Sequence, residues 1–112
     1  MTVEEEVEQM LLDSIAHAKD DVAQRMLIEA RTEAEQMAYT ADRFLAKNGQ
    51  FLQEFEILQS RQLLEQLRAS LNSGDKDLML KQVEALNEYT RPFAERVMDV
   101  AIATAMKGKQ ID

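Results

Sequence analysis

His17 is the only histidine in a chain of 112 residues, and histidine is the side chain that most often exchanges a proton near neutral pH. Asp13 precedes it by four residues, so on a helix the two side chains would share a face and form a weak pair. A lone histidine on a helix is far more often a surface or interface residue than a catalytic one. We therefore assign no catalytic residue to this chain.

The sequence also lacks the patterns that metal sites and covalent catalysis require. Cysteine is absent, which excludes disulfides, a thiol nucleophile and thiolate metal ligands. There is no Glu-x-x-His pair of the kind that holds di-iron centres in helical bundles, no zinc spacing, no glycine-rich phosphate loop and no Gly-x-Ser-x-Gly elbow. We expect no metal and no cofactor in this chain, and binding through shape and apolar surface.

The charge of the chain narrows the class of partner. The formal net charge is −8, and the first 42 residues hold eleven acidic and three basic side chains. Nucleic acids and anionic membranes need a basic stripe, and none is present. No apolar run approaches the ~18 residues that span a bilayer, and no segment resembles a signal peptide. We expect a cytoplasmic protein that binds neither nucleic acid nor membranes.

Composition favours an all-α fold. Only three glycines and one proline occur, and the frequent residues are helix formers. Residues 3–47 contain neither glycine nor proline, and Thr2 and Glu5 have the spacing of a capping box, which predicts a helix that starts at Val3. This helical arm would be roughly 68 Å long. Its apolar residues recur every three or four positions in two successive stripes: Val3, Val7, Met10, Leu11, Ile15 and Ala18, then Ala23, Leu27, Ala30, Ala34, Met37, Ala41 and Phe44.

The second stripe is poor in apolar surface because four of its seven residues are alanine. An alanine methyl contributes only a fraction of the ~1.5–3 kcal/mol that a buried Leu or Phe contributes. We therefore expect the middle of the arm to have little tendency to fold onto a core. Met26 and Leu27, with Ile28 on another face, would leave an apolar patch in water, which predicts self-association of the isolated chain.

The remaining residues predict a compact antiparallel bundle that includes the end of the arm, so residues 1–112 form a single helical subdomain. Helices are expected over residues 52–72, 76–89 and 91–107. The helix over residues 52–72 carries the bulkiest apolar side chains, Phe55 and Leu58 among them, and we expect these in the core.

Turn and cap residues set the expected boundaries. The arm should end at Asn48-Gly49, where glycine tolerates a positive φ. Gly74 is expected in the left-handed region and Asp75 as the cap of the next helix. Thr90 is a natural cap and Pro92 is favoured in a first helical turn, which predicts a new helix there.

A chain this small cannot cover both ends of such an arm. We therefore expect that the front half binds a partner, or that the chain belongs to a larger protein. The apolar docking face that we expect consists of Val7, Met10, Leu11, Met26 and Leu27.

The order of the elements and several segments resemble the helical lid of DnaK-type chaperones. The first helix reads Val7-Glu8-Gln9-Met10-Leu11-Leu12-Asp13-Ser14, and its Met10 and Asp13 match the Met-x-x-Asp core of that family. The segments from Thr90 to Asp99 and from Ala105 to Asp112 look like the HscA branch, which is specialised for iron–sulfur cluster assembly. The resemblance covers nearly the whole chain.

This resemblance implies a parent chaperone with an ATPase domain that binds ATP and Mg²⁺ and a β-sandwich that grips a peptide. The lid would close over the bound peptide in the ADP state and swing away with ATP. The implied client is the cluster scaffold protein, delivered by a J-type co-chaperone. The alternative from the residues alone is a free-standing homodimer that pairs its heptad-like stripe, and the codons upstream of Met1 would distinguish the two.

The family's lid-to-sandwich contact falls on four residues of this chain, which we call the latch residues. They are Asp21, Arg31, Glu35 and Tyr39. Glu35 replaces an aspartate and Tyr39 replaces a histidine of DnaK. A hinge is expected near residues 18–21, where the apolar face shifts, and in the isolated chain the two helices are expected to straighten into one.

Overall fold

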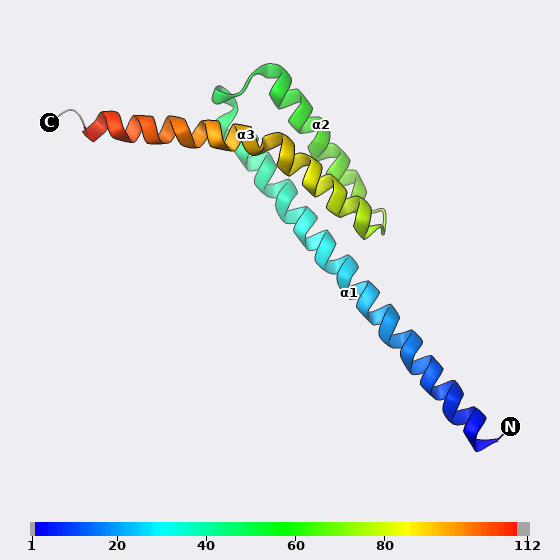
Figure 1. Cartoon of the computed structure of the whole chain (residues 1–112). Helices are drawn as coiled ribbons and strands as arrows, with labels where there is room; N and C mark the ends of the chain where they lie inside the picture. Colours follow the sequence, from blue (N-terminus) through cyan, green and yellow to red (C-terminus); the bar gives the residue numbers. More distant parts are fainter. Residues whose placement is uncertain (1, 110–112) are drawn as a thin grey trace.

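The computed structural model describes residues 2–109, and its secondary structure there is helical, as the sequence predicts (Figure 1). Helix α1 spans Val3–Asn48, the short 3-10 helix η1 spans Gly49–Phe51, α2 spans Glu54–Ser70 and α3 spans Lys76–Lys109. Helices α2 and α3 lie together along one end of α1, whose front half extends away from them. The molecule is long and thin, at 88 × 32 × 16 Å.

Helix α1 begins where the capping box predicts. The Thr2 hydroxyl accepts from the Glu5 amide at 3.3 Å, and the Glu5 carboxylate accepts from the Thr2 amide at 3.4 Å. The helix is continuous through residues 18–21, which agrees with the expected straightening of the isolated chain. At the other end Gly49 has φ −57° and continues into η1, so its tolerance of positive φ is not used.

The connection between α2 and α3 has the predicted chemistry. Gly74 has φ +72°, in the left-handed region that glycine adopts without steric cost. The Asp75 carboxylate accepts from the amides of Asp77 and Leu78, each at 3.1 Å, and so caps α3. This tight turn makes α2 and α3 antiparallel neighbours (Figure 1).

The predicted break between residues 89 and 91 is wrong, because α3 is one helix of 34 residues with Pro92 inside it. Thr90 does not cap; its hydroxyl donates to the Leu86 carbonyl at 2.9 Å within the helix. Proline removes one helical hydrogen bond and bends a helix, and Figure 1 shows α3 changing direction between its yellow and orange parts. The helix continues because Phe93 and Arg96, just beyond the proline, are held by the bundle.

The main core is built on the alanines of α1, contrary to our expectation that this stretch packs weakly. Four alanines there are at most 5% exposed. These small side chains let the backbones of α2 and α3 approach α1 closely. The large side chains of the core therefore come from α2 and α3. Phe55 and Leu58, predicted as core, are instead exposed. The buried cluster is Ala30, Ala34, Ala38, Ala41, Leu64, Leu67, Met79 and Leu86.

A second buried cluster lies where α1, η1 and α3 meet. It contains Leu45, Leu52 and Phe93, with Tyr89 packed edge-on to Phe93 at a ring separation of 5.2 Å. Buried aromatic pairs of this geometry add stability beyond the area that they bury. This cluster fixes α3 on both sides of Pro92.

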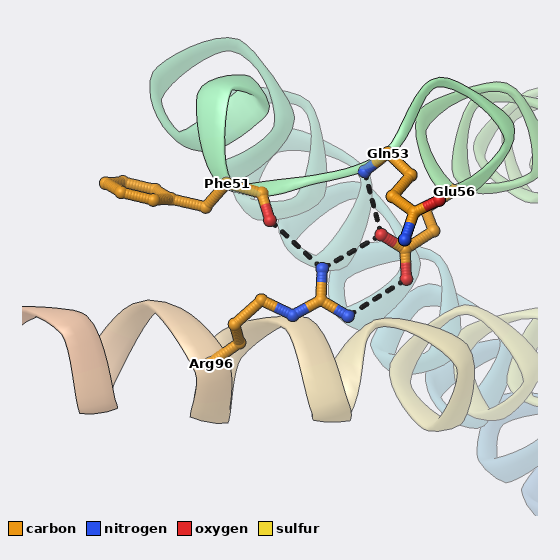
Figure 2. Close-up of polar contacts among 4 residues, drawn as sticks. All are labelled: Phe51, Gln53, Glu56 and Arg96. Carbon is orange, nitrogen blue, oxygen red and sulfur yellow. Dashed lines mark hydrogen bonds and ion pairs between the residues drawn. The ribbon is translucent and has the colours of Figure 1, made fainter.

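An ion pair ties α3 to the start of α2 (Figure 2). The Arg96 guanidinium donates to both carboxylate oxygens of Glu56, at 2.9 and 3.1 Å, and to the Phe51 carbonyl at 3.0 Å. Glu56 is only 7% exposed and also accepts from the Gln53 amide at 2.8 Å. The Arg96 hydrogen bonds, followed by the Gln53 amide, lower the pKa of Glu56 from its ordinary value, and Glu56 in turn raises the pKa of Arg96.

Candidate docking surface on the long helix

Among residues 2–109, the front half of α1 meets another element only near its end, where Asp20, Ala23 and Gln24 line an open hollow with the α2–α3 turn. Every side chain from Thr2 to Met26 is exposed, although this segment carries some of the largest apolar residues of the chain. Val7, Met10 and Leu11 are 49–68% exposed. Among residues 2–109 nothing covers the front apolar stripe, so the chain presents it to solvent or to a partner.

Helical geometry places this stripe on the side of α1 away from the bundle. At 3.6 residues per turn, Val7 and Met10 align with Asp21 and Tyr39 further along the same helix. The alanines that contact α2 and α3 lie roughly opposite. One side of α1 therefore packs into the bundle, and the other forms an exposed strip that is apolar at its front and polar further along.

The five residues predicted as a docking face are not equivalent. Val7, Met10 and Leu11 lie on the uncovered front half. Met26 is exposed but borders a shallow groove of about 160 Å³ with Leu80 of α3. Leu27 is half-buried and packs against the main core. The free part of the predicted face thus ends before Met26.

Three of the latch residues are exposed, and the fourth contacts the bundle. Asp21, Glu35 and Tyr39 are exposed, whereas Arg31 is half-buried and its Nε donates to the Leu71 carbonyl at 3.2 Å. Within residues 2–109 none of the three charged latch residues makes an ion pair. The spacing of 31, 35 and 39 stacks these three side chains on neighbouring turns.

Arg43 is a polar residue of this strip that sequence reasoning missed. Its guanidinium lies 5.7 Å from the centre of the Tyr39 ring and its Nη1 donates to the Tyr39 hydroxyl at 3.2 Å. The i,i+4 spacing of a tyrosine and an arginine on a helix was the signal that could have found this contact. The arginine restrains Tyr39 in an outward position.

One charge on the bundle side of α1, that of Asp42, is paired with α2. Asp42 forms an ion pair with Arg61 of α2 and lies 4.0 Å from Arg68. The hydrogen bond from Arg61 is the main reason that the pKa of Asp42 is lowered. Asp42 therefore helps to hold the bundle together, whereas the carboxylates of Asp21 and Glu35 are exposed and open to another molecule.

Neither the side-chain pair predicted at His17 nor a cluster of metal ligands is found among residues 2–109. The Nδ1 of His17 lies 2.8 Å from the backbone carbonyl of Asp13, and the Asp13 carboxylate accepts from Gln9 instead, so the predicted pair between the two side chains does not form. Residues 2–109 contain no cluster of three or more potential metal ligands. None of the helices described is long and apolar enough to cross a membrane.

Comparison with known proteins assigns nearly the whole chain to one family. Residues 1–99 match the family model described as Hsp70 protein. The chaperone protein HscA homolog of Shewanella sediminis (strain HAW-EB3) is 41% identical over 113 residues, which cover 97% of this chain. The HscA homolog of Shewanella sp. (strain ANA-3) is 37% identical over 107 residues, or 96% of the chain. The chain spans 17–18% of the length of these curated relatives. No solved structure matches.

Proposed function

Because the chain belongs to the Hsp70 family, we propose that it is the helical lid of the peptide-binding domain of an HscA-like ATP-dependent chaperone, closing over a bound client. The observation that carries this proposal is the uncovered apolar front of α1, on the side away from a bundle that has its own core. A lid needs both properties: a rigid end that folds by itself and an open face that presses on another domain.

In this proposal the apolar residues of the front half supply most of the closing energy. Burial of a side chain such as Leu11 contributes roughly 1.5–3 kcal/mol. Exposed ion pairs contribute only about 0–1 kcal/mol each. Asp21 and Glu35 would therefore set the register of the lid on the β-sandwich, while Val7, Met10 and Leu11 hold it closed.

The rest of the mechanism would lie in the longer protein, since this chain corresponds to less than a fifth of its relatives. We assign ATP and Mg²⁺ binding to the ATPase domain of that parent and no cofactor to this chain. The β-sandwich is the direct partner of the lid. The iron–sulfur scaffold protein as client, the J-type co-chaperone and a cytoplasmic location complete the proposal.

The experiment measures release of a labelled peptide from the full-length parent in the ADP state. Asp21→Ala combined with Glu35→Ala should accelerate release, because the lid loses its polar contacts with the sandwich. Glu65→Ala, on an exposed site of α2, is the matched control and should leave the rate unchanged. A rate unaffected by the double substitution would reject the latch, and a rate also unaffected by Leu11→Ser would reject the lid.

A further inference from the structure

Helix α3 contains two neighbouring features that bend helices. Pro92 has no amide hydrogen, so the Glu88 carbonyl lacks its usual helical donor, and the proline ring crowds that carbonyl. The Thr90 hydroxyl donates to the Leu86 carbonyl at 2.9 Å, an arrangement that often bends a helix. The direction of α3 changes in this region (Figure 1). Residues 88–92 are therefore the part of α3 that resists bending least.

Beyond this bend, α3 contacts the bundle over about one turn. Of the α3 side chains that the structure describes, the last that are at least partly buried are Phe93, Arg96 and Val97. Every side chain of residues 98–108 is exposed. We call residues 98–109 the C-terminal arm, which as a helix is about 18 Å long. Its direction relative to the bundle depends on those three residues.

Arg96 makes the most directional of these contacts (Figure 2). Its Nη1 donates to the Phe51 carbonyl at 3.0 Å and to Oε1 of Glu56 at 2.9 Å, and its Nη2 donates to Oε2 of Glu56 at 3.1 Å. A planar guanidinium that is bonded through both of these nitrogens has little freedom to rotate. Phe93 and Val97 restrain the helix less precisely, because apolar contact is not directional.

Both acceptors of Arg96 are themselves held in place. The Phe51 carbonyl belongs to the backbone of η1. The Glu56 carboxylate accepts from the Gln53 amide at 2.8 Å, as part of the capping box that starts α2. Glu56 is also buried, so little water competes for its oxygens. Arg96 therefore ties the part of α3 beyond the bend to the corner between α1 and α2.

We propose that residues 88–92 form a hinge and that Arg96 is the lock that sets the direction of the C-terminal arm. With the Arg96 hydrogen bonds in place, the arm has one direction and follows any movement of the corner between α1 and α2. Without them Phe93 keeps the helix attached, but the arm swings about the hinge. A swing of about 20° would move Ala103, which lies ~15 Å beyond Phe93, by about 5 Å. This device does not depend on the proposed lid role.

The test measures the distance between two spin labels by pulsed electron paramagnetic resonance. The chain has no cysteine, so introduced cysteines carry the labels at chosen sites. Gln36→Cys on α1 and Ala103→Cys on the C-terminal arm, both at exposed positions, report the direction of the arm. Glu54→Cys on α2 and Lys81→Cys on α3 before the bend, also exposed, report the bundle. With no other substitution we expect one narrow distance for each pair.

Arg96→Ala should broaden the distance distribution of the arm pair, or shift its mean, by about 5 Å. The distance of the bundle pair should stay unchanged, because the main core does not include Arg96. Arg91→Ala is the matched control, since it removes an arginine beside the proline and breaks an exposed ion pair with Glu88. That pair joins two residues of one helix, so both distances should stay unchanged in this variant.

A second variant tests the hinge. Pro92→Ala restores an amide donor to the Glu88 carbonyl and removes the clash of the ring. Combined with Arg96→Ala, it should give a narrower distribution for the arm pair than Arg96→Ala alone, because a helix with a complete hydrogen-bond ladder bends less.

Four results would overturn the proposal. An arm distance unaffected by Arg96→Ala would mean that Phe93 and Val97 set the direction without the lock. An equal change with Arg91→Ala would remove the special role of Arg96. A change in the bundle pair with Arg96→Ala would make Arg96 a general support of the bundle. No narrowing on addition of Pro92→Ala would place the bending outside the hinge.

Discussion

The two halves of α1 show that burial along a helix does not follow the size of its apolar side chains. The front half carries Val7, Met10 and Leu11 and buries none of them. The rear half carries Ala30, Ala34, Ala38 and Ala41 and buries all four. Small residues face the neighbouring helices of the same chain, where close approach lets larger residues of α2 and α3 fill the space. The large residues of the front half are left where no neighbour within the described chain meets them, whereas Leu45 in the rear half is buried.

The strongest test of this difference between the two halves of α1 is to place the same substitution in each half. Ala34→Leu should destabilise the bundle by about 1–3 kcal/mol, because three methylene-sized carbons must fit where the alanine is fully buried. Ala18→Leu makes the same change on the exposed front half and should shift stability by no more than about 0.5 kcal/mol. Thermal unfolding followed by circular dichroism measures both. Equal effects would mean that the alanines of the rear half are not closely packed.

A second prediction concerns pH. Because the folded pKa of Glu56 is lowered from its ordinary value of 4.5, its ion pair with Arg96 contributes stability above pH 4.5 and loses it as the pH falls through the folded pKa. Glu56→Gln should lower the melting temperature at pH 7 by several degrees and reduce the further fall on acidification. Glu8→Gln, in the front half, is the control and should melt like the parent at pH 7, since Glu8 is exposed and makes no ion pair within residues 2–109. A melting curve of Glu56→Gln that overlays the parent at pH 7 would show that Arg96 does not hold α3.

The smallest expected effect on stability is that of a substitution at Ser60, inside the bundle. Ser60 is fully buried, and among residues 2–109 its hydroxyl has no hydrogen-bond partner. Ser60→Ala removes an unsatisfied polar group and should be neutral or stabilising by up to about 1 kcal/mol. Denaturant titration measures the change. A clear loss of stability would indicate that the hydroxyl finds a partner in solution.

Sequence reasoning succeeded where the interactions are local. The capping box of Thr2 and Glu5, the left-handed Gly74 and the Asp75 cap all involve residues within three positions of one another, and all are present. It failed at Pro92, because contacts distant in sequence, Phe93 in the second core cluster and Arg96 on Glu56, outweigh a local signal for a break.

The candidate docking surface shows the same division. Periodicity predicted the apolar stripe at Val7, Met10 and Leu11, and the small size of the chain predicted that it would be uncovered; all three side chains are exposed. Periodicity could not show that Leu27 packs into the core or that Arg31 bonds to the end of α2, since both depend on where α2 returns along α1. The latch role of Asp21, Glu35 and Tyr39 rests on family resemblance and remains a prediction.

The amino-acid sequence by itself determined that this protein is helical, where its first helix begins, how its α2–α3 turn is made and that part of its apolar surface has no cover among residues 2–109. Those properties depend on hydrogen bonds between near neighbours and on the period of the helix. Only the tertiary structure decided that alanines of α1 line the core, that α3 passes through its proline and that α3 continues beyond the bundle after Arg96. Those outcomes depend on which helices contact each other. These contacts are set by packing between residues distant in sequence, which local residue patterns do not encode.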